Sequence, residues 1–316
     1  MSKVTIIGVG AVGTATAYCL AQKGLVNEIV LVDIKPGTAE GRALDMRQAA
    51  AIQRFDTNVV GATDDYTETA GSDIIVVTSG MSRKPGMSRS DLVNTNAAIV
   101  TDVVGRAAAA SPNAIILMVS NPLDVLCYCA HAVSKFPKNR VMGMSGLLDI
   151  ARYRSFISEK LQVSTKDIQA LILGGHGNTM VPMPRYTTIG GIPLRQWMDK
   201  ATIDSIIDRT RLGGDELINL LGTSAWHAAG AAICSMIEAI VCDQKRVFPV
   251  CAYLDGEYGL RDIFIGVPVI LGAGGVEKVI ELELDDDDAV RFYESEEVVR
   301  ADVEAMKQEL GYCFQK

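Results

Sequence analysis

A short β-rich run at residues 4–7 leads into a glycine-rich turn with the spacing G-x-G-x-x-G over residues 8–13. A helix-like stretch follows this turn, and a second apolar run at 29–32 ends at Asp33, twenty positions after the last glycine of the turn. Strand, turn, helix, strand and acid in this order are typical of a βαβ unit that binds a dinucleotide. The sequence therefore predicts dinucleotide binding near the start of the chain, with a plain tight turn as the alternative.

The residues of the turn have separate physical tasks in such a unit. Gly8 permits the tight turn, Gly10 lets the backbone approach a pyrophosphate, and Gly13 lets the helix pack closely on the strand. The helix that starts at Ala11 and Val12 offers free N–H groups and the positive end of its dipole to phosphate oxygens. We expect these five residues to bind the cofactor.

Asp33 lies where a carboxylate can accept hydrogen bonds from the hydroxyls of a ribose. Its negative charge would repel a 2′-phosphate, and no arginine follows it directly. The predicted cofactor is therefore NAD rather than NADP.

Composition restricts the classes of partner and the compartment. The chain has 316 residues, of which 48% are hydrophobic and 6% aromatic, so we expect a large and mainly aliphatic core. A net charge of −8 argues against nucleic acid and anionic membranes as partners. No signal peptide or membrane span is visible, and the longest apolar stretch, 225–242, is interrupted by polar residues. Seven cysteines, mostly in apolar runs, favour reduced thiols and a cytoplasmic location.

The first half of the chain alternates between strand-like and helix-like runs, which predicts a doubly wound parallel sheet of the Rossmann type within an α/β fold. The pattern changes near residue 145 and becomes mixed α+β. We therefore expect a cofactor-binding domain at 1–145 and a substrate-binding and catalytic domain at 146–316. The strand-like runs of the first half are 3–8, 28–33, 57–62, 73–79, 114–119 and 140–144, and its helix-like runs are 11–23, 38–52, 90–110 and 123–135.

The second half is expected to open with a long amphipathic helix and to end with another. Between them lie an apolar run, a β-rich and turn-rich patch, two helices and three strands. The helices are expected at 148–161, 202–221, 224–242 and from about 287, the apolar run is 168–173, the β-rich patch is 180–193, and the strands are expected near 247–253, 263–271 and 276–284.

His176 is the histidine most suited to proton transfer. It has glycines on both sides and follows an apolar run, whereas His131 and His227 lie in helix-like segments, where a structural role is the default. A general base needs a partner that fixes its tautomer, and Asp149 is the candidate. Asp149 and Arg152 are three residues apart and share one helix face, although a surface ion pair would have the same spacing.

Two polar segments follow predicted parallel strands, at the sheet edge where ligands bind in such folds. The segment 81–89 is basic and contains Pro85 and Gly86, which suggests a loop that closes over a ligand. A merely solvated loop is the alternative. Ser120 and Asn121 follow the next buried strand, where an asparagine can hold a substrate oxygen and a cofactor amide together.

Two other clusters have ordinary structural explanations. Cys127, Cys129 and His131 lie in a helix-like segment, where residues two apart point to different faces, so no metal site is expected. The acidic run 285–288 is expected to cap the last helix rather than to bind a cation.

Over almost its whole length the chain resembles the lactate/malate dehydrogenase family, and within it the lactate-dehydrogenase-like branch that acts on malate. Six sequence segments match the family pattern in both their order and their spacing. These are the turn Gly8-x-Gly10-x-x-Gly13, Asp33, the loop Arg83-Lys84-Pro85-Gly86-Met87-Ser88-Arg89, Ser120-Asn121-Pro122, Leu148-Asp149-x-x-Arg152 and Gly174-Gly175-His176-Gly177.

The resemblance implies a mechanism of NAD-dependent hydride transfer between malate and oxaloacetate. In it Arg152 holds the C1 carboxylate, Arg83 holds the far carboxylate and Asn121 orients the C2 hydroxyl. Neutral His176 takes the hydroxyl proton, and Asp149 stabilises the imidazolium that forms.

The resemblance implies further contacts around these groups. Arg89 polarises the C2 oxygen, and Ser224 lines the substrate pocket. Asn96 and the backbone around Val119, Ser120 and Asn121 contact NAD. Asn178 departs from the family pattern, which usually has an aspartate after His-Gly.

Three alternatives remain to the interpretation that the chain acts on malate. A lactate or other 2-hydroxyacid dehydrogenase is the nearest, but the loop position of Arg83 is typically a glutamine in lactate enzymes. An NAD-dependent glycoside hydrolase would need a cysteine beside the histidine for its metal, and no cysteine lies next to His176. A silent NAD-binding sensor would have little use for the whole set of polar residues. The expected partners are a dicarboxylate and further copies of the chain, as a homodimer or homotetramer.

Overall fold

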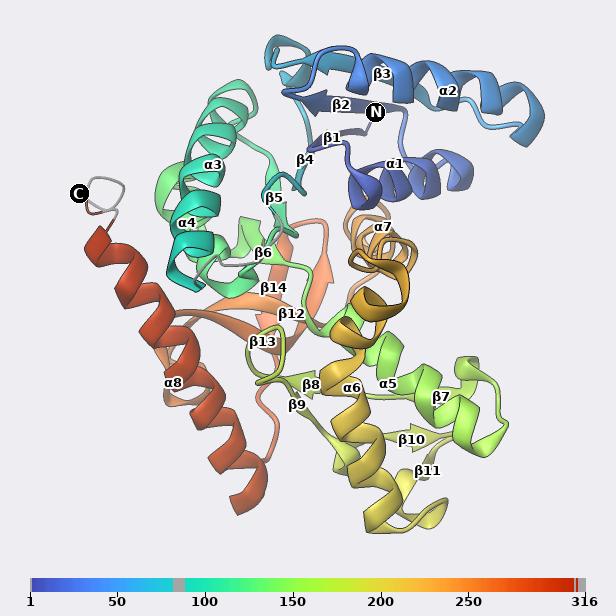
Figure 1. The fold of residues 1–316 in the computed structure, drawn as a ribbon, viewed down its shortest axis with the longest axis vertical. Helices are drawn as coiled ribbons and strands as arrows, with labels where there is room; N and C mark the ends of the chain where they lie inside the picture. The colour runs from blue at the N-terminus through green and yellow to red at the C-terminus, as the bar shows by residue number, and fades with distance from the viewer. Residues whose placement is uncertain (1, 82–88, 310, 312–316) are drawn as a thin grey trace.

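The computed structural model describes residues 2–81, 89–309 and 311, and in this part of the chain a nine-stranded sheet runs through the centre (Figure 1). Its strand order is β14-β13-β12-β6-β5-β4-β1-β2-β3, and the pairs among β1 to β6 are all parallel. The parallel strands are β1 Lys3–Ile7, β2 Glu28–Asp33, β3 Asn58–Thr63, β4 Ile74–Val77, β5 Ile115–Met118 and β6 Val141–Gly143, and the antiparallel strands are β12 Arg246–Asp255, β13 Arg261–Gly272 and β14 Gly275–Val279.

Helices cover both sides of the parallel strands. In Figure 1, α3 and α4 lie together on one side, and α1 and α7 lie on the other. β4 and β5 are buried along their whole length, as expected for strands that are covered on both faces. The doubly wound Rossmann arrangement is confirmed. The helices are α1 Ala11–Lys23, α2 Thr38–Gln53, α3 Arg89–Ala110, α4 Leu123–Ser134, α5 Gly146–Leu161, α6 Lys200–Leu221, α7 His227–Val241 and α8 Asp286–Glu309.

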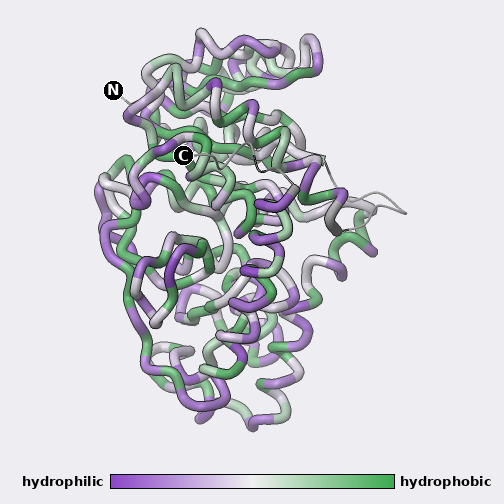
Figure 2. The backbone as a smooth tube through the Cα atoms, turned by 90° about the vertical axis from the view of Figure 1, so that its left-hand side faces the viewer, coloured by the Kyte–Doolittle hydropathy of each residue, from purple (hydrophilic) through white to green (hydrophobic). Residues whose placement is uncertain are grey.

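The second half adds a smaller β-rich part below the main sheet, and it contains the loop that carries His176. Figure 2 shows hydrophilic and hydrophobic residues recurring in turn along the helices, as expected when one helix face packs on the core. No helix among the described residues is both long and apolar enough to cross a membrane. The short strands are β7 Ile168–Gln169, β8 Ile172–Leu173, β9 Val181–Pro182, β10 Thr188–Ile189 and β11 Ile192–Pro193.

The change of architecture falls at the expected place, since β6 ends at Gly143 and α5 begins at Gly146. The main sheet nevertheless continues across this point, because Cys251 of β12 pairs with Gly143 of β6. The division into domains 1–145 and 146–316 therefore stays a prediction.

Two predicted elements end differently in the structure. The strand expected over 276–284 stops at Val279. Ile280 still donates its N–H to Pro268 of β13 at 2.8 Å, and beyond it the chain bonds to the loop around Tyr258. There Leu282 donates to the hydroxyl of Tyr258, and Glu281 accepts from the backbone N–H of Tyr258. The helix expected over 224–242 begins only at His227, since α6 ends in a left-handed cap at Gly222 and the following residues reach into a cavity.

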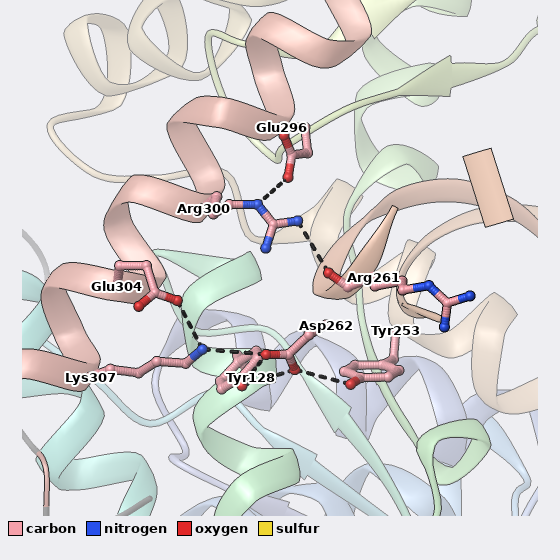
Figure 3. Close-up of polar contacts among 8 residues, drawn as sticks. All are labelled: Tyr128, Tyr253, Arg261, Asp262, Glu296, Arg300, Glu304 and Lys307. Atoms are coloured by element: carbon pink, nitrogen blue, oxygen red, sulfur yellow. Dashed lines mark hydrogen bonds and ion pairs between the residues drawn. The ribbon is translucent and has the colours of Figure 1, made fainter. Parts of the chain in front are cut away.

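The last helix, α8, is capped and anchored by charged residues. Asp285 accepts the backbone N–H of Asp288 at 2.9 Å, which confirms the capping role of the acidic run. Farther along, Asp262 of β13 accepts hydrogen bonds from Tyr128 and Tyr253, both at 3.0 Å, and lies 3.4 Å from the ammonium group of Lys307 (Figure 3). This cluster ties α8 to α4 and to the main sheet.

Helix α2 approaches β3 so closely that a side chain at Gly61 would collide with its backbone. A Cβ atom there would lie 2.4 Å from the carbonyl group of Ala39. We predict that Gly61→Ala lowers the free energy of unfolding by about 1–3 kcal/mol, as overpacking does. Denaturant titration at one protein concentration measures the change.

Gly41 provides the matched control, because it lies in α2 with no atom within 4 Å of its Cβ position. Gly41→Ala should raise the free energy of unfolding by up to about 1 kcal/mol, since alanine favours a helix. Equal effects of the two substitutions would contradict the close packing at Gly61.

Candidate active site

Two cavities lie along the carboxyl edge of the parallel strands, one on each side of the glycine-rich turn. The first has a volume of about 500 Å³ and includes Val12, Asn121 and His176 in its lining. The second has a volume of about 620 Å³ and is lined by residues that include Gly10 and Asp33. Ligands bind at this edge in open α/β sheets because the strand order reverses there. An elongated ligand could occupy both cavities across the turn.

The glycine-rich turn has the geometry that a pyrophosphate needs. Gly8 has a φ of +92°, and a Cβ atom there would lie 2.6 Å from the backbone nitrogen of Ser79. A Cβ atom at Gly13 would lie 2.1 Å from the carbonyl oxygen of Gly8. Gly10, directly before α1, has open space where its Cβ would be, so a ligand can reach the N–H groups of Ala11 and the rest of the first turn.

The adenosine side of such a ligand would meet Asp33 at the end of β2. One carboxylate oxygen of Asp33 accepts the backbone N–H of Val9 at 2.8 Å, and the other accepts that of Lys35 at 2.9 Å. Each oxygen keeps a lone pair for a hydroxyl group. The hydroxyl of Ser79, which lines the same cavity, is buried without a hydrogen-bond partner in the described chain. The residues present therefore fit a dinucleotide.

Two residues that are expected to contact the cofactor, Asn96 and Ser120, form hydrogen bonds to the protein backbone. The side chain of Asn96 accepts the backbone N–H of Met81 at 2.7 Å and donates to the backbone carbonyl of Asn121 at 2.7 Å. The hydroxyl of Ser120 donates to the carbonyl oxygen of Ser79. These bonds hold the strand ends in place, and a contact of Asn96 or Ser120 with NAD stays a prediction. Val119, Asn121 and Val12 line the first cavity, and their contact with the cofactor likewise stays a prediction.

His176, Asp149 and Arg152 form a connected group in the first cavity. Asp149, in the first turn of α5, is 1% exposed and uses both carboxylate oxygens. One oxygen lies 2.9 Å from Nδ1 of His176, and the other accepts a hydrogen bond of 3.1 Å from Arg152. The predicted pairing of histidine and aspartate is therefore present in the structure, and Asp149 is no surface residue.

The environment of His176 favours its charged form. Burial lowers the pKa of the imidazole, but the charge of Asp149, its hydrogen bond to the ring and the charge of Asp124 outweigh that effect. The pKa of His176 is therefore raised above its usual value, although nearby Arg152 acts in the opposite direction. Such a group can both accept and return a proton near neutral pH.

Arg152 bonds to Asp149 through one terminal nitrogen and lines the first cavity. Its Nε is buried and has no hydrogen-bond partner in the part of the chain that the structure describes. Its side chain passes over two glycines of α6: a Cβ atom at Gly213 would lie 3.2 Å from Cδ of Arg152, and one at Gly214 would lie 3.8 Å from a terminal nitrogen. This glycine pair has no role in the predictions made from the sequence. Because glycine costs about 1 kcal/mol in a helix interior, the pair was a detectable signal.

Of the remaining predicted site residues, the structure describes the side chain of Ser224 but not those of Arg83 and Arg89. Ser224 lines the first cavity, together with Arg211, which the sequence analysis missed and which donates to the carbonyl oxygen of Met180 at 3.2 Å. Arg83 lies outside the described residues. Helix α3 begins at Arg89, whose side chain is also outside them.

Within the described residues no group of three or more histidine, cysteine or acidic side chains could hold a metal ion. His131 packs against the rings of Tyr253 and Phe264, with ring centroids 5.2 and 5.6 Å away.

Comparison with known proteins identifies the family of the chain. The family model described as the NAD binding domain of lactate/malate dehydrogenase matches residues 2–143, and that of the alpha/beta C-terminal domain matches residues 147–310. A malate dehydrogenase of Cytophaga hutchinsonii is 55% identical over 89% of this chain and 90% of its own length.

Solved structures agree with this assignment. The malate dehydrogenase of Salinibacter ruber has 51% identity and a TM-score of 0.93, with 97% of this chain and 98% of that chain covered. The malate dehydrogenase of Picrophilus torridus has 39% identity and a TM-score of 0.95, with 98% and 99% covered. The chain belongs to the lactate/malate dehydrogenase family.

Proposed function

We propose that the chain catalyses the reversible NAD-dependent oxidation of (S)-malate to oxaloacetate. The observation that carries this proposal is the buried group of His176, Asp149 and Arg152, which lies in the cavity beside the dinucleotide turn. The group combines a proton acceptor with an anion-binding arginine, as the oxidation of a hydroxy acid requires. Relatives that are about half identical over nearly the whole chain are named malate dehydrogenase.

Arginines are proposed to bind the two carboxylates of the substrate. Arg152, which lines the first cavity, binds the C1 carboxylate as a bidentate pair. Arg83 binds the far carboxylate, and this assignment rests on the sequence alone. Arg89 polarises the C2 oxygen, and Ser224 lines the pocket. Asn121 orients the C2 hydroxyl.

His176 is proposed as the general base for malate and the general acid for oxaloacetate. When Nδ1 donates its proton to Asp149, Nε2 presents a lone pair to the C2 hydroxyl. The imidazolium that forms is stabilised by the adjacent carboxylate, so Asp149 acts as the orienting partner of the base. Bound NAD supplies the chemistry of hydride acceptance from C2.

NAD is proposed to lie across both cavities on the turn between them. The glycine-rich turn and the start of α1 would bind the pyrophosphate, Asp33 the ribose, and the ends of β4 and β5 the nicotinamide side. The proposed cofactor residues are Gly8, Gly10, Ala11, Val12, Gly13, Asp33, Asn96, Val119, Ser120 and Asn121.

The cysteines support a proposal about the compartment. None of the described cysteines forms a disulfide bond. Cys127 and Cys251 are buried neighbours, and burial raises the pKa of both thiols. Reduced thiols in contact suit a reducing environment, so we propose that the chain works in the cytoplasm.

The choice between malate and lactate is tested by comparing oxaloacetate with pyruvate in an NADH oxidation assay. We expect kcat/KM for oxaloacetate to exceed that for pyruvate by about 100-fold or more, because pyruvate would leave the charge of Arg83 without a partner, which costs several kcal/mol when the charge is buried. Arg83→Gln should remove most of this preference, whereas Arg195→Gln, at an exposed position of the second half, should leave it intact. A strong preference for malate over lactate in Arg83→Gln would contradict the assignment of Arg83.

The role of His176 predicts opposite pH dependences for the two directions. Because its pKa is raised, the protonated form persists to higher pH than for a free imidazole. kcat/KM for malate should rise with pH through this raised pKa, and kcat/KM for oxaloacetate should fall through it. Initial rates across the pH range measure both curves.

Replacing the base should abolish this behaviour. His176→Asn should lower kcat by about 10²–10⁴-fold, with little change in the KM for NADH. His227→Asn, at an exposed residue at the start of α7, should keep both the rate and the pH profile. Near-normal turnover by His176→Asn would refute the assignment of the base.

Assembly with further copies of the chain is the remaining proposal, as a homodimer or homotetramer. Helix α6 exposes Leu220 and Leu221, which are 75% and 51% exposed, and α2 exposes Ile52 at 81%. Large apolar side chains that gather on exposed helix faces are typical of protein contacts. We expect light scattering to give at least twice the monomer mass of 33.9 kDa.

A substitution pair tests which helix is involved. Leu220→Lys on α6 should lower the mass measured at low concentration, because a charge would be buried without a partner. Val290→Lys, at a 57% exposed position on α8, should leave the mass unchanged. A monomer from the unmodified chain would contradict the proposal.

A further inference from the structure

A second buried carboxylate contacts the residue that carries the proposed general base. Asp124 lies in the first turn of α4 and is 5% exposed. Its Oδ2 accepts the backbone N–H of His176 at 2.9 Å. Asp149 bonds to the ring of the same histidine, so two carboxylates from two helices hold His176 at its backbone and at its side chain. The proposed mechanism makes no use of Asp124.

Apart from the bond to His176, the Asp124 carboxyl group has few polar partners. Its Oδ1 is buried and has no hydrogen-bond partner in the described chain. The thiol of Cys251, on β12, lies beside the carboxyl group, and Cys127 of α4 is also close enough to feel its charge. The pKa of Asp124 is raised, because burial outweighs the backbone N–H and the charge of His176, which both lower it. A buried carboxylate with so few partners is costly, and its strongest partner is the His176 segment.

The contact joins two parts of the site that are far apart in the sequence. Helix α4 directly follows Asn121 and Pro122 at the end of β5, whereas His176 lies between β8 and β9. The fit is close, since a Cβ atom at Gly175 would lie 3.5 Å from Oδ2 of Asp124 and 2.7 Å from the side chain of Val299. The hydrogen bond therefore fixes the base relative to Asn121, which is proposed to orient the reacting hydroxyl.

We propose that Asp124 is a positioning residue for His176, whose carboxylate anchors the His176 backbone on α4 and adds a second negative charge near the imidazole. The proposal rests on the function of His176 proposed above. Within the part of the chain that the structure describes, the charges that act on the imidazole come from Asp149 and Arg152 of α5 and from Asp124 of α4. Two negative charges against one positive charge favour the imidazolium, so removal of the Asp124 charge should lower the pKa of His176.

Asp124→Asn separates charge from shape. Its side-chain oxygen can still accept the backbone N–H of His176, but the negative charge is gone. We expect the pKa of His176 to fall by roughly half a unit or more, with kcat on the plateau within about threefold of the unmodified enzyme. The pH profiles of kcat/KM for malate oxidation and for oxaloacetate reduction should both move to lower pH.

The pKa can also be read without turnover. The chain has only three histidines, so an NMR titration of labelled imidazoles gives three curves, and His176→Asn identifies the one to follow. This readout needs neither cofactor nor substrate.

Asp124→Leu tests the anchoring role, because leucine keeps a similar shape but cannot accept a hydrogen bond. We expect kcat to fall by about tenfold to 100-fold, since small displacements of a reacting group are costly. The KM for NADH should stay within about twofold, because the glycine-rich turn is untouched. If Asp124→Leu does not fold, the titration of Asp124→Asn still decides the proposal.

Ser295→Ala is the matched control. Ser295 is 2% exposed and accepts the backbone N–H of Gly175 at 2.9 Å, so the substitution removes a neighbouring anchor without removing a charge. An unchanged pKa of His176 in Ser295→Ala, together with a lowered one in Asp124→Asn, would support the proposal.

The proposal is overturned if the titration curve of His176 is the same in Asp124→Asn and the unmodified enzyme. It is also overturned if Ser295→Ala lowers the pKa equally, because loop packing would then explain the shift. Failure of the unmodified enzyme to turn over malate or oxaloacetate would instead refute the proposed function. The NMR titration would still decide the charge effect of Asp124 in that case.

Discussion

The charge of Asp149 is the constraint around which the site is organised. A carboxylate that is 1% exposed must be paired, because burial of an isolated charge costs many kcal/mol. Asp149 meets this requirement by giving one oxygen to His176 and the other to Arg152. Since the partners are a base and an anion-binding group, one buried charge fixes both proton transfer and substrate orientation. Loss of either partner would leave part of that charge unsatisfied.

This arrangement depends on close approach of backbones that only glycine allows. Gly266 of β13 bonds to Gly174, and a Cβ atom at Gly266 would lie 2.4 Å from the carbonyl oxygen of Gly174. The segment before His176 is thus held against the main sheet. Gly213 and Gly214 leave the space through which Arg152 reaches the cavity. Glycines in the second half therefore serve the substrate side much as the turn at residues 8–13 serves the cofactor side.

Local sequence patterns predicted the parts of the molecule that local interactions determine. The buried parallel strands, the glycine-rich turn and the last helix were predictable because their residue patterns act over a few neighbours. The pairing of Asp149 with His176 was a hypothesis that became specific only through the family resemblance, because the two residues are distant in sequence. Asp124 was missed for the same reason. In the sequence it is one acidic residue of an otherwise apolar helix.

The end of β14 and the start of α7 differ from the predicted positions for a similar reason. The strand after Val279 ends because the hydroxyl of Tyr258 bonds to the carbonyl oxygen of Ile280 and to the N–H of Leu282, backbone groups that a longer strand would use in the sheet. Nothing in residues 280–284 themselves signals this competition. The late start of α7 leaves the short stretch with Ser224 free to line the cavity. In both places a long-range contact overrides the local preference.

The arginines in the first cavity carry a charge opposite in sign to the net charge of the chain. The chain carries a net charge of −8, which repels a dicarboxylate at long range. The first cavity nevertheless contains Arg152 and Arg211, and the two buried carboxylates near it are bonded to His176 rather than left to face a ligand. A substrate anion that enters the cavity therefore meets these two arginines, together with the exposed carboxylate of Asp215 in the same lining. Because screening limits the net charge to about 8–10 Å in physiological salt, the local arrangement governs binding once the anion is inside.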